Sequence, residues 1–184
     1  DADGLFMFIT PVVEDVLGYR PDELAGQLHF YDLHPAEGRA AFKAAAFDVF
    51  RRRGKFRDLE NPMLDKDGRT VWVSTNAMPL LDKNGALLGY RGVDFDITAR
   101  KLAEEALRES ETRLRTLNDN LPGGLVYQMD TGMDGGKRRL LAVSKGVERL
   151  HGVTAEEALS NQKTFYLQVV EEDQAMVAEL EARA

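Results

Sequence analysis

The sequence predicts an α+β fold in which short helices precede an antiparallel sheet. Asp67-Gly68 and Asn84-Gly85 each separate two stretches rich in β-forming residues, and such dipeptides favour the positive φ of hairpin turns. Between Arg39 and Arg53 the apolar residues lie roughly on one side of a predicted helix, whose end is basic. Residues 1–98 are therefore predicted as one strand, three helical segments and a three-stranded antiparallel meander.

The first predicted strand and the two helices after it are short. Residues 5–10 are apolar, which predicts a buried strand. The Thr10 hydroxyl can cap the next helix. Pro11 then occupies the first helical position, where a missing N–H is tolerated. This helix is expected to stop at Gly18, and a single helical turn follows at residues 21–26.

Three longer strands form the predicted meander, and a helix follows them. The strands cover residues 55–64, 70–81 and 87–97, and the two glycine turns join them. The helix is predicted from Thr98 to Asn118, a stretch without glycine or proline.

Apolar and small residues recur along this last helix at four- and three-residue spacing, flanked by Glu and Arg, which is typical of a coiled coil. The predicted dimer seam consists of Ala103, Leu107, Ser110, Leu114, Leu117 and Leu121. The pattern is short, so two interpretations stay open. One is a parallel pair of helices, and the other is a single amphipathic helix packed on a sheet.

The second part of the chain repeats the first. Residues 140–157 align with residues 6–23, and both contain an apolar strand, a hydroxyl residue, Val-Glu, a glycine and an acidic turn. In the second copy Thr154 and Glu157 form a predicted capping box, whereas Arg20 stands at the first of these positions in the first copy. Such self-similarity predicts tandem copies of one module. Strands of the second copy are predicted at 124–129 and 139–143, and a long helix is predicted to run to the end of the chain.

Several short motifs follow one another in a characteristic order. They are Glu14 with Leu17-Gly18-Tyr19, Pro21 with Glu23-Leu24, His34-Pro35, Asp67-Gly68 with Trp72-Val73, and Asp96-Ile97-Thr98. Together they resemble the PAS domain with its C-terminal PAC motif, over residues 1–98 and in part over residues 121–184. The resemblance implies a sensory module with a five-stranded antiparallel sheet, short helices over one face and a small enclosed cavity.

The resemblance also implies a division of the chain. Residues 1–98 would be a PAS/PAC domain without its first strand, residues 99–120 a helical signalling linker, and residues 121–184 the N-terminal part of a second PAS domain. The missing strand is central in the family's sheet, and an unpaired edge attracts another strand. Residues 124–130 could therefore fill that place in another copy by strand exchange. The alternative is that the chain is a piece of a longer protein.

A ligand pocket is expected where the long helix covers the meander. Strand alternation places Leu59, Asn61 and Met63 on one face of a strand, and Val73 and Thr75 on one face of the next. The candidate pocket residues are Tyr31, Phe42, Ala46, Phe47, Phe50, Leu59, Asn61, Met63, Val73 and Thr75. Asn61 and Thr75 would be the polar handles of a small ligand. A packed apolar core without a ligand is the alternative, and the face presented by Asp94 stays open.

The residue types argue against several cofactors. The chain has no cysteine, which excludes disulfides, a cysteine nucleophile and a covalent flavin adduct, while non-covalent flavin stays open. His29, His34 and His151 lack a second ligand at metal-binding helical spacing, so we expect no metal site. Haem-binding PAS domains usually carry an axial histidine on the long helix, and residues 39–53 contain none, so haem is not expected. No cofactor is required by the sequence, and no catalytic constellation stands out.

Charge and hydropathy narrow the expected partners and location. The net charge of -7 and the pI of about 5.1 disfavour nucleic acid and anionic membrane. No apolar run approaches the roughly 20 residues of a membrane span, and no signal peptide opens the chain. We therefore expect a cytoplasmic protein, whose parent could be membrane-anchored. A homodimer through the linker helix or the sheet faces is expected.

The end of the last strand is the predicted site of signal relay. Asp96 can pair with Arg100 or a nearby strand residue, Ile97 follows it, and Thr98 can cap the helix. Trp72 lies on the face opposite Val71 and Val73, where it is expected to meet the linker helix or a partner. The resemblance implies an input module of a bacterial sensor histidine kinase in a two-component phosphorelay. A diguanylate cyclase or phosphodiesterase parent and a ligand-free dimerisation module are the alternatives, and any catalysis would lie outside this chain.

Overall fold

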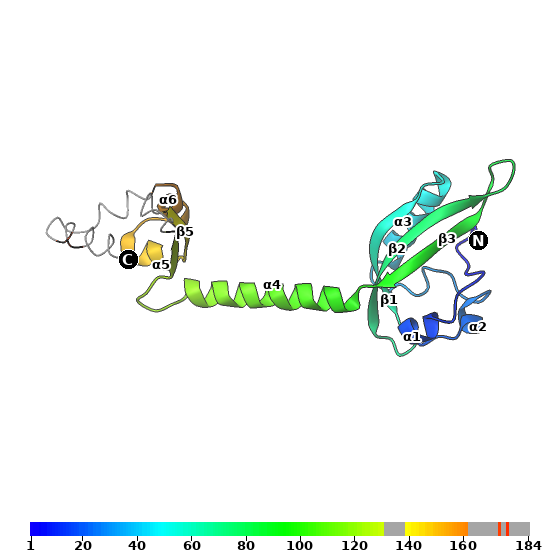
Figure 1. Cartoon of the computed structure of the whole chain (residues 1–184), viewed down its shortest axis with the longest axis horizontal. Coiled ribbons are helices and arrows are strands. Elements are labelled where there is room, and N and C mark those ends of the chain that lie inside the picture. Colours follow the sequence, from blue (N-terminus) through cyan, green and yellow to red (C-terminus); the bar gives the residue numbers. More distant parts are fainter. Residues whose placement is uncertain (131–138, 162–172, 174–175, 177–184) are drawn as a thin grey trace. The chain divides into compact units, whose positions relative to one another are not determined.

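The computed structural model describes residues 1–130, 139–161, 173 and 176 (Figure 1). The chain divides into two compact units, Asp1–Glu105 and Ala106–Ala184. The first unit is an α+β domain with an antiparallel sheet, as the sequence predicts.

Three helices precede the sheet of the first unit: α1 at Val13–Leu17, α2 at Pro21–Leu24 and α3 at Arg39–Arg51. Helix α1 ends at Gly18, whose φ of 72° is the left-handed conformation that a helix terminus favours. The predicted cap by Thr10 is wrong. The helix begins later, no side chain caps it, and Thr10 contributes its carbonyl oxygen to the N–H of Val13 at 3.1 Å.

Strands β1 (Phe56–Leu64), β2 (Thr70–Leu81) and β3 (Leu87–Asp96) form the predicted meander in the order β1-β2-β3. An aspartate closes each turn. Asp65 Oδ1 accepts the N–H groups of Asp67 and Arg69 at 3.0 and 2.7 Å. Asp82 Oδ1 accepts those of Asn84 and Ala86, both at 2.8 Å. These side-chain bonds hold the turns that the glycine dipeptides predict.

The expected five-stranded sheet has three strands among the described residues of the first unit. The predicted buried strand at residues 5–10 forms only an isolated antiparallel bridge between Leu5 and His29. The backbone of residues 5–10 forms hydrogen bonds with a nearby segment instead; for example, Phe6 N donates to Leu28 O at 3.0 Å. Met7 and Phe8 are exposed, so the prediction that this segment is buried holds only in part.

The helices of the first unit pack on one face of the sheet (Figure 1). Leu17 and Leu24 of the short helices form a buried cluster with Met63 and Val73 of the strands. At the other end, Phe50 of α3 stacks on Tyr90 of β3 with 4.2 Å between the ring centroids. The Tyr90 hydroxyl donates to the carbonyl of Gly54 at 2.8 Å, which fastens the loop after α3 to the sheet.

Helix α4 covers Thr98–Asp119 and none of its residues is buried. The predicted seam residues are exposed, including Leu107, Leu114 and Leu117. The seam and the alternative of a single amphipathic helix both stay predictions.

The second unit contains β4 (Tyr127–Asp130), β5 (Arg139–Val143), α5 (Gly146–His151) and α6 (Ala155–Ser160). Strand β4 pairs with β5 of the same copy, which contradicts the hypothesis that this segment is exchanged with another molecule. The capping box is present, because Thr154 Oγ1 accepts from Glu157 N at 3.1 Å and Glu157 Oε2 accepts from Thr154 N at 2.8 Å. The long helix predicted at the end of the chain falls outside the described residues, apart from two isolated positions.

Candidate functional site

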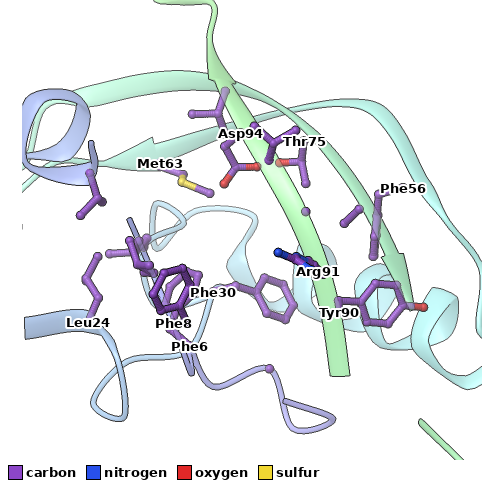
Figure 2. Close-up of a pocket in the computed structure, with 18 of the residues that line it drawn as sticks. Phe6, Phe8, Leu24, Phe30, Phe56, Met63, Thr75, Tyr90, Arg91 and Asp94 are labelled. Atoms are coloured by element: carbon purple, nitrogen blue, oxygen red, sulfur yellow. The ribbon is translucent and has the colours of Figure 1, made fainter. Parts of the chain in front are cut away.

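A cavity of about 850 Å³ lies between the inner face of the sheet and the helices of the first unit. Figure 2 shows Thr75 and Asp94 close together on the strands, with Phe6, Phe8 and Leu24 on the opposite side. Strands β1, β2 and β3 each contribute inward-facing side chains, since alternate residues of a strand point to the same face.

Most of the predicted pocket residues line this cavity. They are Phe42, Ala46, Phe50, Leu59, Asn61, Met63, Val73 and Thr75. Tyr31 and Phe47 are not among the lining residues. The Tyr31 ring lies under the ammonium group of Lys43, with 3.9 Å from Nζ to the ring centroid, and the Phe47 ring packs against Phe50 at 5.2 Å. These two aromatic residues therefore lie outside the cavity lining.

Sequence reasoning missed the contribution of β3 to the cavity. Tyr90 and Asp94 line it, as do further aromatic residues such as Phe30 and Phe56. The Asn84-Gly85 turn alone did not give this signal, because its register would pair Thr75 with Val93; a bulge between Leu80 and Leu81 shifts the register by one residue and pairs Thr75 with Asp94. Residues paired across a sheet share a face, so Asp94 lies on the same face as Thr75.

Asn61, Thr75 and Asp94 form the polar end of the cavity. Asn61 Nδ2 donates to the Leu59 carbonyl at 3.2 Å and to Thr75 Oγ1 at 3.1 Å. Thr75 then donates its own proton to the Asp94 carboxylate. The Leu59 carbonyl can only accept, so it fixes the orientation of the Asn61 amide. The amide oxygen of Asn61 is buried and has no hydrogen-bond partner among the described residues.

Two effects act on the Asp94 carboxyl. Burial within the concave wall raises the pKa of Asp94 above its ordinary value, and the hydrogen bond from Thr75 lowers it by less. Asp94 still has substantial accessible surface. Both observations fit a side chain that protein surrounds on most sides but that faces the open cavity.

The start of α4 is bound to β2 through backbone groups. Trp72 N donates to Thr98 Oγ1 at 2.9 Å, and Ile97 N donates to Trp72 O at 2.9 Å. Asp96 Oδ1 accepts from Thr98 N at 2.8 Å. The roles therefore differ from the prediction: the Thr98 side chain binds the strand, and Asp96 caps the helix.

Glu60 of β1 completes this joint and was missed by sequence reasoning. Arg100 Nη2 lies 2.6 Å from Glu60 Oε1, and its Nη1 lies 2.7 Å from Glu104. Arg100 thus pairs with these two glutamates where the sequence suggested Asp96. Lys101 also pairs with Glu60, and its Nζ lies 5.2 Å from the Trp72 ring centroid. The hydrogen bonds from Lys101 and then Arg100 lower the pKa of Glu60.

Comparison with known proteins identifies this architecture. Residues 6–94 match the family model described as the PAS fold. The chain contains a PAS domain.

The PAS domain has relatives in several kinds of signalling protein. The chain is 27% identical over 126 residues to the bacterioopsin transcriptional activator of Halobacterium salinarum, covering 67% of this chain and 18% of that protein. It is 31% identical over 122 residues to the two-component system protein A of Emericella nidulans, covering 64% of this chain and 17% of that protein. The chain thus spans less than a fifth of the length of these relatives.

Among solved structures, the sensory box histidine kinase/response regulator from Burkholderia thailandensis matches with a TM-score of 0.48 and 25% identity. The match covers 60% of this chain and 82% of that chain.

Two histidines of the PAS domain contact neighbouring side chains or backbone groups of the domain. His34 is buried, stacks on Phe42 with 4.5 Å between centroids, and places Nδ1 2.9 Å from the Pro35 carbonyl. His29 contacts Asp32 at 3.2 Å. Within the described residues, no group of three or more His, Cys, Asp or Glu side chains could hold a metal ion. A search of the described helices finds none with the length and apolar character needed to cross a membrane.

Strand β2 connects the cavity of the PAS domain with the helix joint. Thr75 and Val73 line the cavity, and Trp72 lies next to Val73 on the opposite face. The backbone of Trp72 binds Ile97 and Thr98, so β2 contacts both the cavity and the first turn of α4.

Proposed function

We propose that the PAS domain binds a small molecule in the cavity and relays its presence through α4 to an output domain elsewhere in the protein. The observation that carries this proposal is the sharing of β2 between the cavity and the joint. A ligand only has to favour one of two packings of β2 to change the output, so a modest difference in affinity is enough.

The relay would run through contacts on both faces of the sheet. On the inner face, Thr75 responds to the ligand, and on the outer face, Trp72 contacts α4. Glu60, Arg100 and Lys101 hold the helix start against β1. These ion pairs are exposed and individually weak, which suits a joint that must change its geometry.

The output is proposed to be a sensor histidine kinase of a two-component phosphorelay. The relative named two-component system protein A supports this class, and the bacterioopsin transcriptional activator indicates that related PAS domains also occur in other signalling proteins. A diguanylate cyclase or phosphodiesterase is the alternative. The proposed module is non-catalytic and cytoplasmic, and it does not bind nucleic acid.

We propose three segments for the chain: residues 1–98 as the PAS/PAC domain, 99–120 as the signalling linker and 121–184 as part of a second PAS domain. Helices α1 and α5 support the tandem repeat. Each is followed by a left-handed glycine, Gly18 with φ 72° and Gly152 with φ 71°, and each precedes a second short helix.

A second candidate function is ligand-free dimerisation. The row of exposed leucines on α4 favours it, as do Val93 and Phe95, which are exposed on β3. In this case the linker helix or the sheet faces would bind a second copy, and the cavity would remain part of a packing core.

Native mass spectrometry of the freshly purified chain, with an absorbance scan of the same sample, tests the sensory proposal. A discrete small-molecule adduct that disappears on unfolding is the expected result. A clean dimer mass with no adduct would favour the dimerisation function instead.

A further inference from the structure

The charged residues around the cavity show where a charged group of a ligand could bind. Three charged residues border it: Asp1, Arg91 and Asp94. Arg91 is exposed and pairs with Met78, one position out of phase with Thr75 and Asp94, so strand alternation does not place it beside them. Asp1 is engaged locally: its terminal ammonium donates to the Leu5 carbonyl at 2.8 Å, and its Oδ1 accepts the N–H groups of Asp3 and Leu5 at 3.0 and 2.9 Å. Asp94 is therefore the charged group available to a ligand on the inner face.

The hydrogen bonds around Asp94 leave only acceptors for a ligand. Thr75 accepts a hydrogen bond from Asn61 and donates its single hydroxyl proton to Asp94, so it has no proton left to donate to a ligand. Both amide protons of Asn61 are directed at the Leu59 carbonyl and Thr75. What remains is the Asp94 carboxylate in the cavity wall and the buried amide oxygen of Asn61, which has no hydrogen-bond partner within the part of the chain that the structure describes. A ligand that offered further acceptors here would meet like polarity.

The rest of the wall is apolar and rich in aromatic rings. Phe6, Phe30, Phe50, Phe56 and Tyr90 border the cavity from five different positions along the chain. Aromatic faces stabilise apolar groups by burial and attract ammonium groups through their quadrupole. An anionic group would be repelled by the Asp94 carboxylate and would not be attracted to the negative faces of the rings.

We propose that the cavity selects a small amphipathic amine, whose ammonium group donates to the Asp94 carboxylate and whose apolar body lies against the aromatic wall. Asn61 and Thr75 are positioning residues: they hold the carboxylate through one directed chain of hydrogen bonds. This inference rests on the proposed sensory function and adds the chemical class of the ligand. Burial of Asp94 disfavours its charged form in the free protein, so a bound cation restores a stabilising partner to that charge.

A panel of matched fragments tests this selectivity on the full chain. Each apolar body is offered as an amine, an alcohol and a carboxylate, for example phenethylamine, phenethyl alcohol and hydrocinnamate, and binding is followed by calorimetry and NMR. The amines should bind about tenfold or more tightly than the carboxylates. Asp94→Asn should weaken amine binding by about tenfold and leave alcohol binding within about twofold.

Asp67→Asn is the matched control, since it removes the same charge from an exposed turn outside the cavity lining. It should leave all three classes unchanged. Thr75→Val removes the positioning hydrogen bond but keeps the Asp94 carboxyl, so it should weaken amine binding less than Asp94→Asn does. Carboxylate fragments that bind as tightly as amines, or an Asp94→Asn variant with unchanged amine affinity, would overturn the ligand class but leave the sensory function in place. Binding of no fragment in any class, together with no adduct in native mass spectrometry, would overturn both.

Discussion

At the scale of single residues, the environment of Asp94 is set by two opposing effects, burial and the hydrogen bond from Thr75. Removing the hydroxyl while keeping the shape, as in Thr75→Val, leaves only the effect of burial. The pKa of Asp94 should therefore rise further above its ordinary value. A carbon-detected NMR titration of the aspartate side chains measures this shift. Thr70→Val, at the exposed start of β2, is the control, and a fall in the pKa of Asp94 would contradict the assignment.

A second residue-scale prediction concerns the buried cluster beneath the cavity. Leu24 is fully buried, so Leu24→Ala should lower the free energy of unfolding by about 2–5 kcal/mol. Trp72 is the single tryptophan of the chain, and its fluorescence during urea unfolding reports on the first unit alone. Leu102→Ala, at a position 65% exposed on α4, should change stability by less than about 0.5 kcal/mol. Equal effects of the two variants would argue against the cluster as the core.

At the scale of elements, the joint between β1 and α4 depends on the charge of Glu60. Lys101 and Arg100 lower the pKa of Glu60, so its folded value lies below the unfolded one. The stabilisation is complete above the unfolded pKa and is lost as the pH falls through the folded pKa. Trp72 fluorescence should change over this acidic window, because Lys101 moves away from the ring.

Glu60→Gln keeps the shape of the side chain but cannot titrate, and it should abolish this acidic fluorescence change. The Glu104→Gln variant is the matched control, because Glu104 contacts Arg100 and, at 3.9 Å, Lys101 within α4 and does not hold the helix to the sheet. An acidic transition that persists unchanged in Glu60→Gln would show that another group controls the joint.

The elements that the sequence predicted well are those determined by local signals. The bounds of β2 are as predicted, and those of β1, β3, α3 and α4 differ by one or two residues, because turn dipeptides and helix periodicity act over a few residues. The pairing of residues 5–10 depends on contacts with residues distant in sequence, such as the bridge from Leu5 to His29. The prediction of a buried strand there was therefore only partly right.

The candidate site shows the same limit. The lining residues of β1 and β2 follow from strand alternation, but Asp94 needed the register between β2 and β3. Glu60 could not be predicted as the partner of Arg100, since they lie 40 positions apart and many other acidic residues compete for the same role. Asp96 was the nearest candidate in sequence, yet its carboxylate binds the Thr98 N–H.

At the scale of the whole molecule, the exposed row on α4 predicts self-association. Leu107 and Leu114 are 61% and 57% exposed, which is unusual for a regular row of leucines unless a second helix covers it. The double variant Leu107→Asp and Leu114→Asp should weaken the dimer at least about tenfold, because each charge would be buried in a seam. Sedimentation equilibrium measures the dissociation constant. Leu102→Asp lies outside the seam pattern and should leave it unchanged; a dimer of equal strength in all three proteins would refute the seam.

The two hydrogen bonds that hold Trp72 to the start of α4 have a thermodynamic consequence. If occupancy of the cavity changes the free energy of a helix position, then any protein that captures the helix in that position changes the affinity of the cavity by the same factor. The dissociation constant of the ligand is then a property of the assembly rather than of this domain. A sensor built this way can be retuned by exchanging its partner, with every residue around the ligand left as it is.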